Sequence, residues 1–261
     1  MHTILRRRDR HRHASHLTKF IFSVSGFLSI LAVWQLIAHV KASPAMPSAV
    51  GILRTVFYFA RDGPFINHVA ASLSILFSGI AFAAAFGFAV GLLLYRYELF
   101  KAVVYPIIEC VRGIGALTLF PLLIVLFGLG ASARVFVIFW TAWPAIVLST
   151  LESLKVDQSV IDAVRTAGAG DWVILFHIRI PMAAGGILTG IRIGAGGGWI
   201  SLIAAEMLGA QKGIGFFLLW SSQSFQYEKV YASIVIIALI GGATNILLLL
   251  LQKIFQNTGD K

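Results

Sequence analysis

Among the ionisable residues in the long apolar stretches of this sequence, four are candidates for charge pairing or for the binding of a charged solute. They are Glu109, Arg112, Arg192 and Glu206. An ionised side chain in apolar surroundings is expensive unless it is paired or faces water, so all four are candidates for a substrate path. Glu109 and Arg112 are three residues apart and can instead pair on one helix face. Arg192 can instead extend toward a polar interface. An anionic solute would suit either arginine.

The sequence contains no residue set that predicts catalysis or metal binding. No nucleophile–base pair or histidine cluster is evident in the apolar stretches, which argues against an enzyme. The single cysteine, Cys110, can form no intrachain disulfide, and no Cys/His group has metal-site spacing. No glycine-rich phosphate loop is followed by lysine and serine or threonine, so the chain cannot bind ATP in that way. We expect no catalytic residue, metal or cofactor on this chain.

The elements that must position these charges are helices crossing a lipid bilayer. Of the 261 residues, 58% are hydrophobic and only 12% are charged, whereas soluble domains have about a quarter charged residues. A run of about twenty apolar residues can cross the hydrocarbon core as a helix. Such runs lie at roughly 20–40, 68–94, 102–128, 133–151, 183–207 and 230–254. We therefore predict an all-α membrane protein with six transmembrane helices.

Basic residues favour one side of these predicted spans. The formal net charge is +10, and five arginines fall within the first twelve residues. No further basic cluster or base-stacking set follows, so we expect a topology signal and no nucleic-acid partner. With the N-terminus in the cytosol, more of the later lysines and arginines also lie there, and both termini are cytosolic. The predicted divisions are a basic arm at 1–19, a membrane domain at 20–257 and a tail at 258–261.

Small residues recur every fourth position in two of the predicted spans. One stripe is Gly79, Ala83, Gly87 and Gly91, and the other is Gly186, Gly190, Gly194 and Gly198. A four-residue interval keeps each stripe on one helix face, where the missing side chains let a neighbouring backbone approach closely. We predict packing surfaces at both.

A polar segment of about 152–181 interrupts the apolar pattern. Ser159 and Asp162 match a capping box, which predicts a helix that begins near Val160. Gly168 and Gly170 then end that helix, and Asp171 can cap a second short one. Pro181 suits the first turn of the following span. The pattern predicts two short helices with a glycine elbow, either presented to a partner or resting as an amphipathic hairpin on lipid headgroups.

This segment resembles the cytoplasmic loop of binding-protein-dependent ABC importer permeases. That loop has an acidic residue followed by two alanines, a glycine six residues after the acidic position, and then Ile-x-Leu-Pro. The matching positions are Asp162, Ala163, Gly168, Ile178 and Pro181. Aspartate stands where glutamate is usual, Val164 replaces the second alanine, and Ile180 replaces leucine.

Over nearly its whole length the chain is similar to the nitrate/sulfonate/taurine-type permeases. The residues that carry this likeness are Pro47 to Val50, His68, Ser72-Leu73, Pro121-Leu122 through Phe127-Gly128, Thr189 to Arg192, Ala204 to Met207 and Gly213 to Gly215. One departure stands after Arg112, where the subgroup usually has a proline and this chain has Gly113-Ile114-Gly115. Because of this departure, the sequence does not predict how the third span bends.

The resemblance implies the type I importer fold and a division of labour between subunits. Such permeases work in pairs in the bacterial inner membrane, and we expect a homodimer. Each copy docks its cytosolic loop on an ABC ATPase that binds ATP and Mg. A periplasmic or lipid-anchored binding protein delivers the solute, which enters the cytoplasm. Known solutes of such permeases include sulfonates, taurine, nitrate, cyanate, bicarbonate and pyrimidine vitamin precursors.

An ion-coupled secondary transporter is the alternative from another class of membrane protein. Such a carrier needs ionisable relays and often broken helices near the middle of the membrane. The few charges in the predicted spans and the loop at 152–181 argue against it. The dependence of uptake on ATP distinguishes the two.

Overall fold

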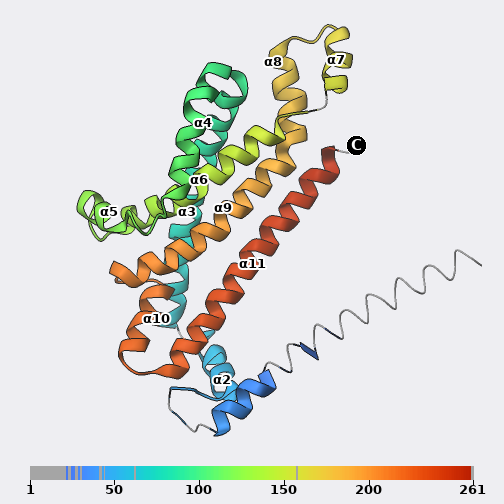
Figure 1. The fold of residues 1–261 in the computed structure, drawn as a ribbon. Helices are drawn as coiled ribbons and strands as arrows, with labels where there is room; N and C mark the ends of the chain where they lie inside the picture. The colour runs from blue at the N-terminus through green and yellow to red at the C-terminus, as the bar shows by residue number, and fades with distance from the viewer. Residues whose placement is uncertain are drawn as a thin grey trace, which may run out of the picture.

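The computed structural model describes residues 22, 25, 26, 29, 31–40, 43, 45–61, 63–156 and 158–259. Within these residues the chain is helical between short connections and contains no strand (Figure 1). Leu31–Val40 is helical. The later elements are α2 (Ala49–Phe59), α3 (Gly63–Arg96), α4 (Glu98–Gly113), α5 (Phe120–Phe127), α6 (Ala131–Ser153), α7 (Gln158–Thr166), α8 (Asp171–Ile174), a π-helix (Leu175–Arg179), α9 (Ile180–Gly209), α10 (Ile214–Gln223) and α11 (Tyr227–Gly259).

Four of the described helices are long and apolar enough to cross a membrane. They cover Pro64–Arg96, Ala131–Ser153, Asp171–Gly209 and Tyr227–Phe255. These helices confirm the spans predicted at 68–94, 133–151, 183–207 and 230–254. Of the predicted first span, Leu31–Val40 is described as a continuous helix, and much of 20–30 lies outside the described residues. The arm at 1–19 lies wholly outside them.

The predicted third span, 102–128, is not one continuous helix. α4 ends at Gly113, the chain then makes turns, and α5 begins at Phe120. Glycine is a poor helix former, and Pro121 stands at the start of α5, where its missing N–H costs nothing. The indole of Trp140 on α6 donates a 3.2 Å hydrogen bond to the Ile114 carbonyl in the break. The glycines that replace the expected proline are therefore where the helix ends.

Helix α6 lies at the centre of the bundle because both small-residue stripes pack against it. A Cβ added to Gly79 or Gly87 of α3 would come within 2.9 Å of Ile138 or Ile146. On the other side, Gly194 of α9 lies so close to Ala142 that an added Cβ would meet its backbone at 3.1 Å. The prediction of packing surfaces is confirmed. This close approach gains van der Waals contact that side chains would prevent.

The two ends of the bundle carry different elements. α7 and α8 project beyond the other helices at one end, which we call the α7 end, and α4 reaches toward the same end (Figure 1). α2 and α10 lie at the opposite end. α9 runs from the α7 end to α10 and packs along α6 and α11. The candidate loop and the charged residues are therefore held by one helix framework.

Candidate functional sites

The elbow after α7 is built from one glycine in a left-handed conformation. Gly168 has φ +90°, and its N–H donates to the Arg165 carbonyl at 3.0 Å. The next N–H, of Ala169, donates to the Val164 carbonyl at 3.3 Å. These two bonds are the pair that closes a helix in the Schellman motif and that favours glycine at the left-handed position. The predicted elbow is confirmed, and its geometry is fixed by backbone hydrogen bonds.

Two details of the predicted loop differ in the structure. α7 begins at Gln158, so Ser159 is inside the helix and is not its N-cap. The second short helix is not separate, because α8, the π-helix and α9 follow one another without a break. Pro181 does stand at the start of α9. A proline clashes with the carbonyl four residues earlier, which lies in the π-helix, and this wider turn relieves that clash.

Polar contacts hold α7 against the start of α8 and hold the loop against the bundle. Arg165 Nη2 lies 2.9 Å from Asp171 Oδ1. Arg179 Nη1 donates to the Leu154 carbonyl at 3.0 Å, and its guanidinium lies 5.0 Å from the centre of the Tyr95 ring. The first contact spans the elbow, and the second joins the loop exit to the ends of α6 and α3. The loop is therefore supported at its elbow and at its exit.

The predicted loop residues differ in exposure. Asp162, Ala163 and Gly168 are exposed, and Val164 is half-buried. Ile178 and Ile180 are half-buried at the exit, whereas Pro181 is exposed. Among the described side chains of α7, only Ile161, with 1% of its surface exposed, is fully buried. The loop thus anchors itself by Ile161 and presents its acidic and small residues outward.

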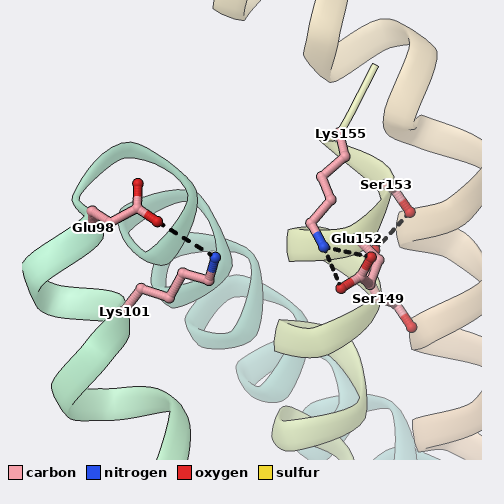
Figure 2. Close-up of polar contacts among 6 residues, drawn as sticks. All are labelled: Glu98, Lys101, Ser149, Glu152, Ser153 and Lys155. Carbon is pink, nitrogen blue, oxygen red and sulfur yellow. Dashed lines mark hydrogen bonds and ion pairs between the residues drawn. The ribbon is translucent and has the colours of Figure 1, made fainter. Parts of the chain in front are cut away.

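Short-range ion pairs surround the loop at the α7 end. Figure 2 shows Lys155 contacting both carboxylate oxygens of Glu152, at 2.7 and 2.8 Å, beyond the last turns of α6. It also shows the ion pair of Lys101 and Glu98 on α4, in which the Nζ–Oε1 distance is 3.9 Å. Exposed pairs of this kind contribute little to stability, about 0 to 1 kcal/mol each. Both pairs are local contacts between residues three positions apart, and we assign them no further role.

The four charged candidates for the substrate path fall into three environments. Glu109 and Arg112 pair with each other on α4, with Arg112 Nη1 at 3.2 and 3.3 Å from the two carboxylate oxygens. Arg192 lines a groove of about 400 Å³ between α9 and α11, together with Asn245. The Arg192 Nε is buried and has no hydrogen-bond partner among the described residues. Glu206 is buried near the last residue of α9, at the end of this helix that is farther from α7.

Glu206 joins three elements at the end of the bundle opposite α7. Its side chain is 1% exposed. Oε1 accepts a 2.7 Å hydrogen bond from the Ser72 hydroxyl of α3, and Oε2 accepts one of 2.9 Å from the Gly215 N–H of α10. The Ser72 oxygen in turn accepts from the Ile214 N–H at 2.9 Å. We call Ser72, Glu206, Ile214 and Gly215 the Glu206 network. Its bonds favour a structural role for Glu206, whose place on a substrate path stays a prediction.

The loop that precedes α10 is tied to the same region. The Gly213 N–H donates to His68 Nδ1 at 3.1 Å, and Arg134 Nη1 donates to the Lys212 carbonyl at 3.2 Å. Gly213 has φ +134°, and a side chain there would overlap the Glu206 carboxylate. The carboxylate therefore requires glycine at 213, whereas Gly215 is required because an added Cβ would overlap the Ile203 carbonyl of α9. Sequence reasoning named His68, Ser72 and Glu206 separately but missed that each of them accepts a hydrogen bond from the segment Gly213 to Gly215.

Comparisons with known proteins agree with this fold. The family described as "Binding-protein-dependent transport system inner membrane component" matches residues 79–258, more than half of the chain. The taurine transport system permease protein TauC of Escherichia coli (strain K12) is 30% identical over 239 residues, covering 88% of this chain and 87% of that protein. The nitrate import permease protein NrtB of Synechocystis sp. is 31% identical over 221 residues, covering 81% of this chain and 78% of that protein.

Solved structures support the fold. A chain of the MetNI methionine ABC transporter in an inward-facing conformation matches with a TM-score of 0.64 at 19% identity. The match covers 73% of this chain and 95% of that chain. At this identity the likeness shows the fold alone. Taken with the family match, these findings show that the chain belongs to the binding-protein-dependent transport system inner membrane component family and is a multi-pass membrane permease of an ABC importer.

Proposed function

We propose that this permease moves a small anionic or sulfonate-like solute into the cytoplasm, driven by a separate ATPase that docks on α7. The observation that supports the coupling role is that the α7 loop is both exposed and held rigidly. It presents Asp162 and Ala163 outward while Arg165 and Arg179 hold it against its own helix framework. A rigid segment can transmit a partner's movement to the helices that hold it, whereas a flexible segment would deform instead. ATP and Mg would be bound and hydrolysed by the partner.

The remaining features of the proposal follow from this division of labour. Two copies of the permease, as a homodimer, would present two α7 helices to a pair of ATPase subunits. A substrate-binding protein would deliver the solute at the opposite end of the bundle. Basic residues at the α7 end, among them Arg96, Arg165 and Arg179, support placing that end and both termini in the cytosol. The permease domain would then be 20–257, with 152–181 as the coupling loop.

Arg192 supports an anionic solute. A cation within a membrane span is expected to face a partner or water, and the Arg192 Nε has no hydrogen-bond partner among the residues described. Arg112, in contrast, already contacts Glu109. The relatives are named for taurine, aliphatic sulfonates and nitrate, and a sulfonate or nitrate group can take hydrogen bonds from a guanidinium. We therefore place the solute near Arg192, in the groove between α9 and α11.

Uptake by the complete transporter in proteoliposomes tests this proposal. With ATP inside the vesicles, accumulation of labelled taurine, an alkylsulfonate or nitrate should depend on hydrolysis. Arg192→Gln should lower that uptake about tenfold, because one charge-assisted hydrogen bond is lost. Lys253→Gln, which removes an exposed cation of α11 outside the groove, should leave uptake unchanged.

Two results would count against the proposal. Uptake that follows an ion gradient without ATP would favour a secondary transporter. An Arg192→Gln transporter with wild-type kinetics would remove Arg192 from the substrate path. Arg112→Gln gives a further comparison, and its effect should be smaller than that of Arg192→Gln because Arg112 is already paired.

A further inference from the structure

A basic cavity lies at the α7 end, between the last turn of α3 and the helix that leaves the coupling loop. Its volume is about 210 Å³. Three arginines and one carboxylate line it, namely Arg96, Arg165, Arg179 and Asp171, together with Tyr95 and Trp172. Among its lining residues, cations outnumber anions by three to one. Such a cavity is suited to an anion with several acceptor oxygens.

The three guanidiniums are positioned by different neighbours. Arg165 contacts Asp171, the carboxylate of the cavity, at 2.9 Å. Arg179 is held by the Leu154 carbonyl and the Tyr95 ring, which leaves its charge without a carboxylate partner in the described part of the chain. Arg96 lies 5.7 Å from the centre of the Tyr97 ring and forms no ion pair with a described residue. Two positive charges in the cavity are thus not neutralised by a contacting carboxylate.

The backbone at the cavity is irregular where it supplies one of these cations. The π-helix Leu175–Arg179 contributes its first and last residues, Leu175 and Arg179, to the wall. Single π-helical turns within α-helices occur frequently at functional sites. Since Arg179 is also tied to Leu154, its guanidinium is held in place before any ligand arrives. A preorganised cation binds an anion at a smaller entropic cost than a mobile one.

The location identifies the source of the anion. Arg96 is the last residue of the span Pro64–Arg96, and Asp171 is the first residue of the span Asp171–Gly209. The two walls therefore meet near the ends of two helices that are long and apolar enough to cross a membrane, and phosphate headgroups lie at the ends of membrane-crossing helices. The indole of Trp172, 65% exposed and stacked on Phe176 at 5.8 Å, is of the type enriched at that depth. Basic pockets between membrane helices on the cytoplasmic side are suited to lipid headgroups.

We propose that this cavity binds the phosphate group of an anionic phospholipid in the inner leaflet, a placement that rests on the orientation proposed above. Arg96 of α3 and Arg179 of the π-helix would donate hydrogen bonds to the same phosphate. The lipid would then join the end of α3 to the coupling loop through its headgroup. Asp171 opposes the anion by its charge and by its contact with Arg165.

Lipid binding to the purified, delipidated full-length permease tests the proposal without any transport assay. Phosphatidylglycerol and phosphatidylcholine of equal chain length are added in detergent, and bound lipid is measured by native mass spectrometry. Phosphatidylglycerol should bind at least several-fold more tightly. Arg96→Gln should weaken that binding about tenfold, because it removes a charge-assisted hydrogen bond. Asp171→Asn should strengthen it, because it removes the opposing carboxylate. Lys253→Gln, at an interfacial cation outside the cavity, should match the wild type.

Three outcomes would overturn the inference. Equal binding of the two lipids would show no preference for an anionic headgroup. Equal weakening by Arg96→Gln and Lys253→Gln would show diffuse attraction to basic residues and no built cavity. Displacement of the lipid headgroup by millimolar inorganic phosphate would identify free phosphate as the occupant. Because all arms measure binding by the isolated permease, they remain interpretable if the proposed solute or coupling role is wrong.

Discussion

Glu206→Ala should destabilise the permease by about 3 kcal/mol, because it leaves two buried donors, the Ser72 hydroxyl and the Gly215 N–H, without their carboxylate acceptor. The loss would fall on the end of the bundle where α3, α9 and α10 meet. The free energy of unfolding of the detergent-solubilised protein, measured by denaturant titration, checks this expectation. Gly213 and Gly215 would no longer be positioned by the carboxylate they approach.

Two further variants separate the Glu206 network from a general effect of losing a carboxylate. Glu109→Ala makes the same change at an exposed ion pair and should change the free energy of unfolding by less than about 1 kcal/mol. Glu206→Gln keeps one acceptor oxygen and should fall between Glu206→Ala and the wild type. If Glu206→Ala were no more destabilising than Glu109→Ala, the structural role of the network would be refuted.

Gly168→Asp should leave the permease in the membrane but uncouple it from the ATPase. A residue with a Cβ is strained at φ +90°, at a cost of about 1 to 2 kcal/mol, so the Schellman bonds that close α7 would be distorted. Apart from its two chain neighbours, no residue has a heavy atom within 4 Å of a Cβ placed there, so the effect arises from the backbone and not from a clash. Copurification of the ATPase and ATP-dependent uptake should both fall sharply, while the amount of permease in the membrane stays the same.

Gly170→Asp is the matched control for this prediction. It introduces the same charge two residues away, also with no residue beyond the chain neighbours within 4 Å of the added Cβ. Gly170 precedes α8 as its N-cap, with φ −76° and ψ 160°, and aspartate is favoured at such a position. This variant should therefore retain the ATPase and uptake. Equal loss of the ATPase in both variants would mean that charge, and not the elbow, causes the defect.

The features that could be predicted from the sequence are those set by local pattern. Apolar length identified the four long spans, and four-residue spacing identified the faces of α3 and α9 that pack on α6. The elbow at Gly168 followed from a glycine placed directly after a short amphipathic helix. In each case the deciding information lies within a few helical turns of chain. Of these features, Gly168 belongs to the candidate site, and its left-handed backbone is one that glycine adopts without strain.

The features that could not be predicted depend on partners distant in the sequence. Ser72 and Glu206 are separated by 134 positions, and no local period marks their contact. The end of α4 at Gly113 is partly stabilised by Trp140, which lies 26 positions beyond the Ile114 carbonyl that it contacts. The π-helix before Pro181 is a backbone adjustment that periodicity does not report. Local rules therefore located the polar loop at 152–181 but not the contacts that hold it against the bundle.

Cross-linking from α7 to the ATPase tests the central claim, that this helix is the contact through which the transporter is driven. Ala163→Cys, in a Cys110→Ser background, places a single thiol on the exposed surface of α7. In the assembled transporter, a short thiol-to-amine cross-linker should join this thiol to the ATPase subunit. Val50→Cys, an exposed position on α2 at the other end of the bundle, should give no such product. Absence of the product at position 163 in an assembled, transport-active complex, or an equal yield from position 50, would contradict the account.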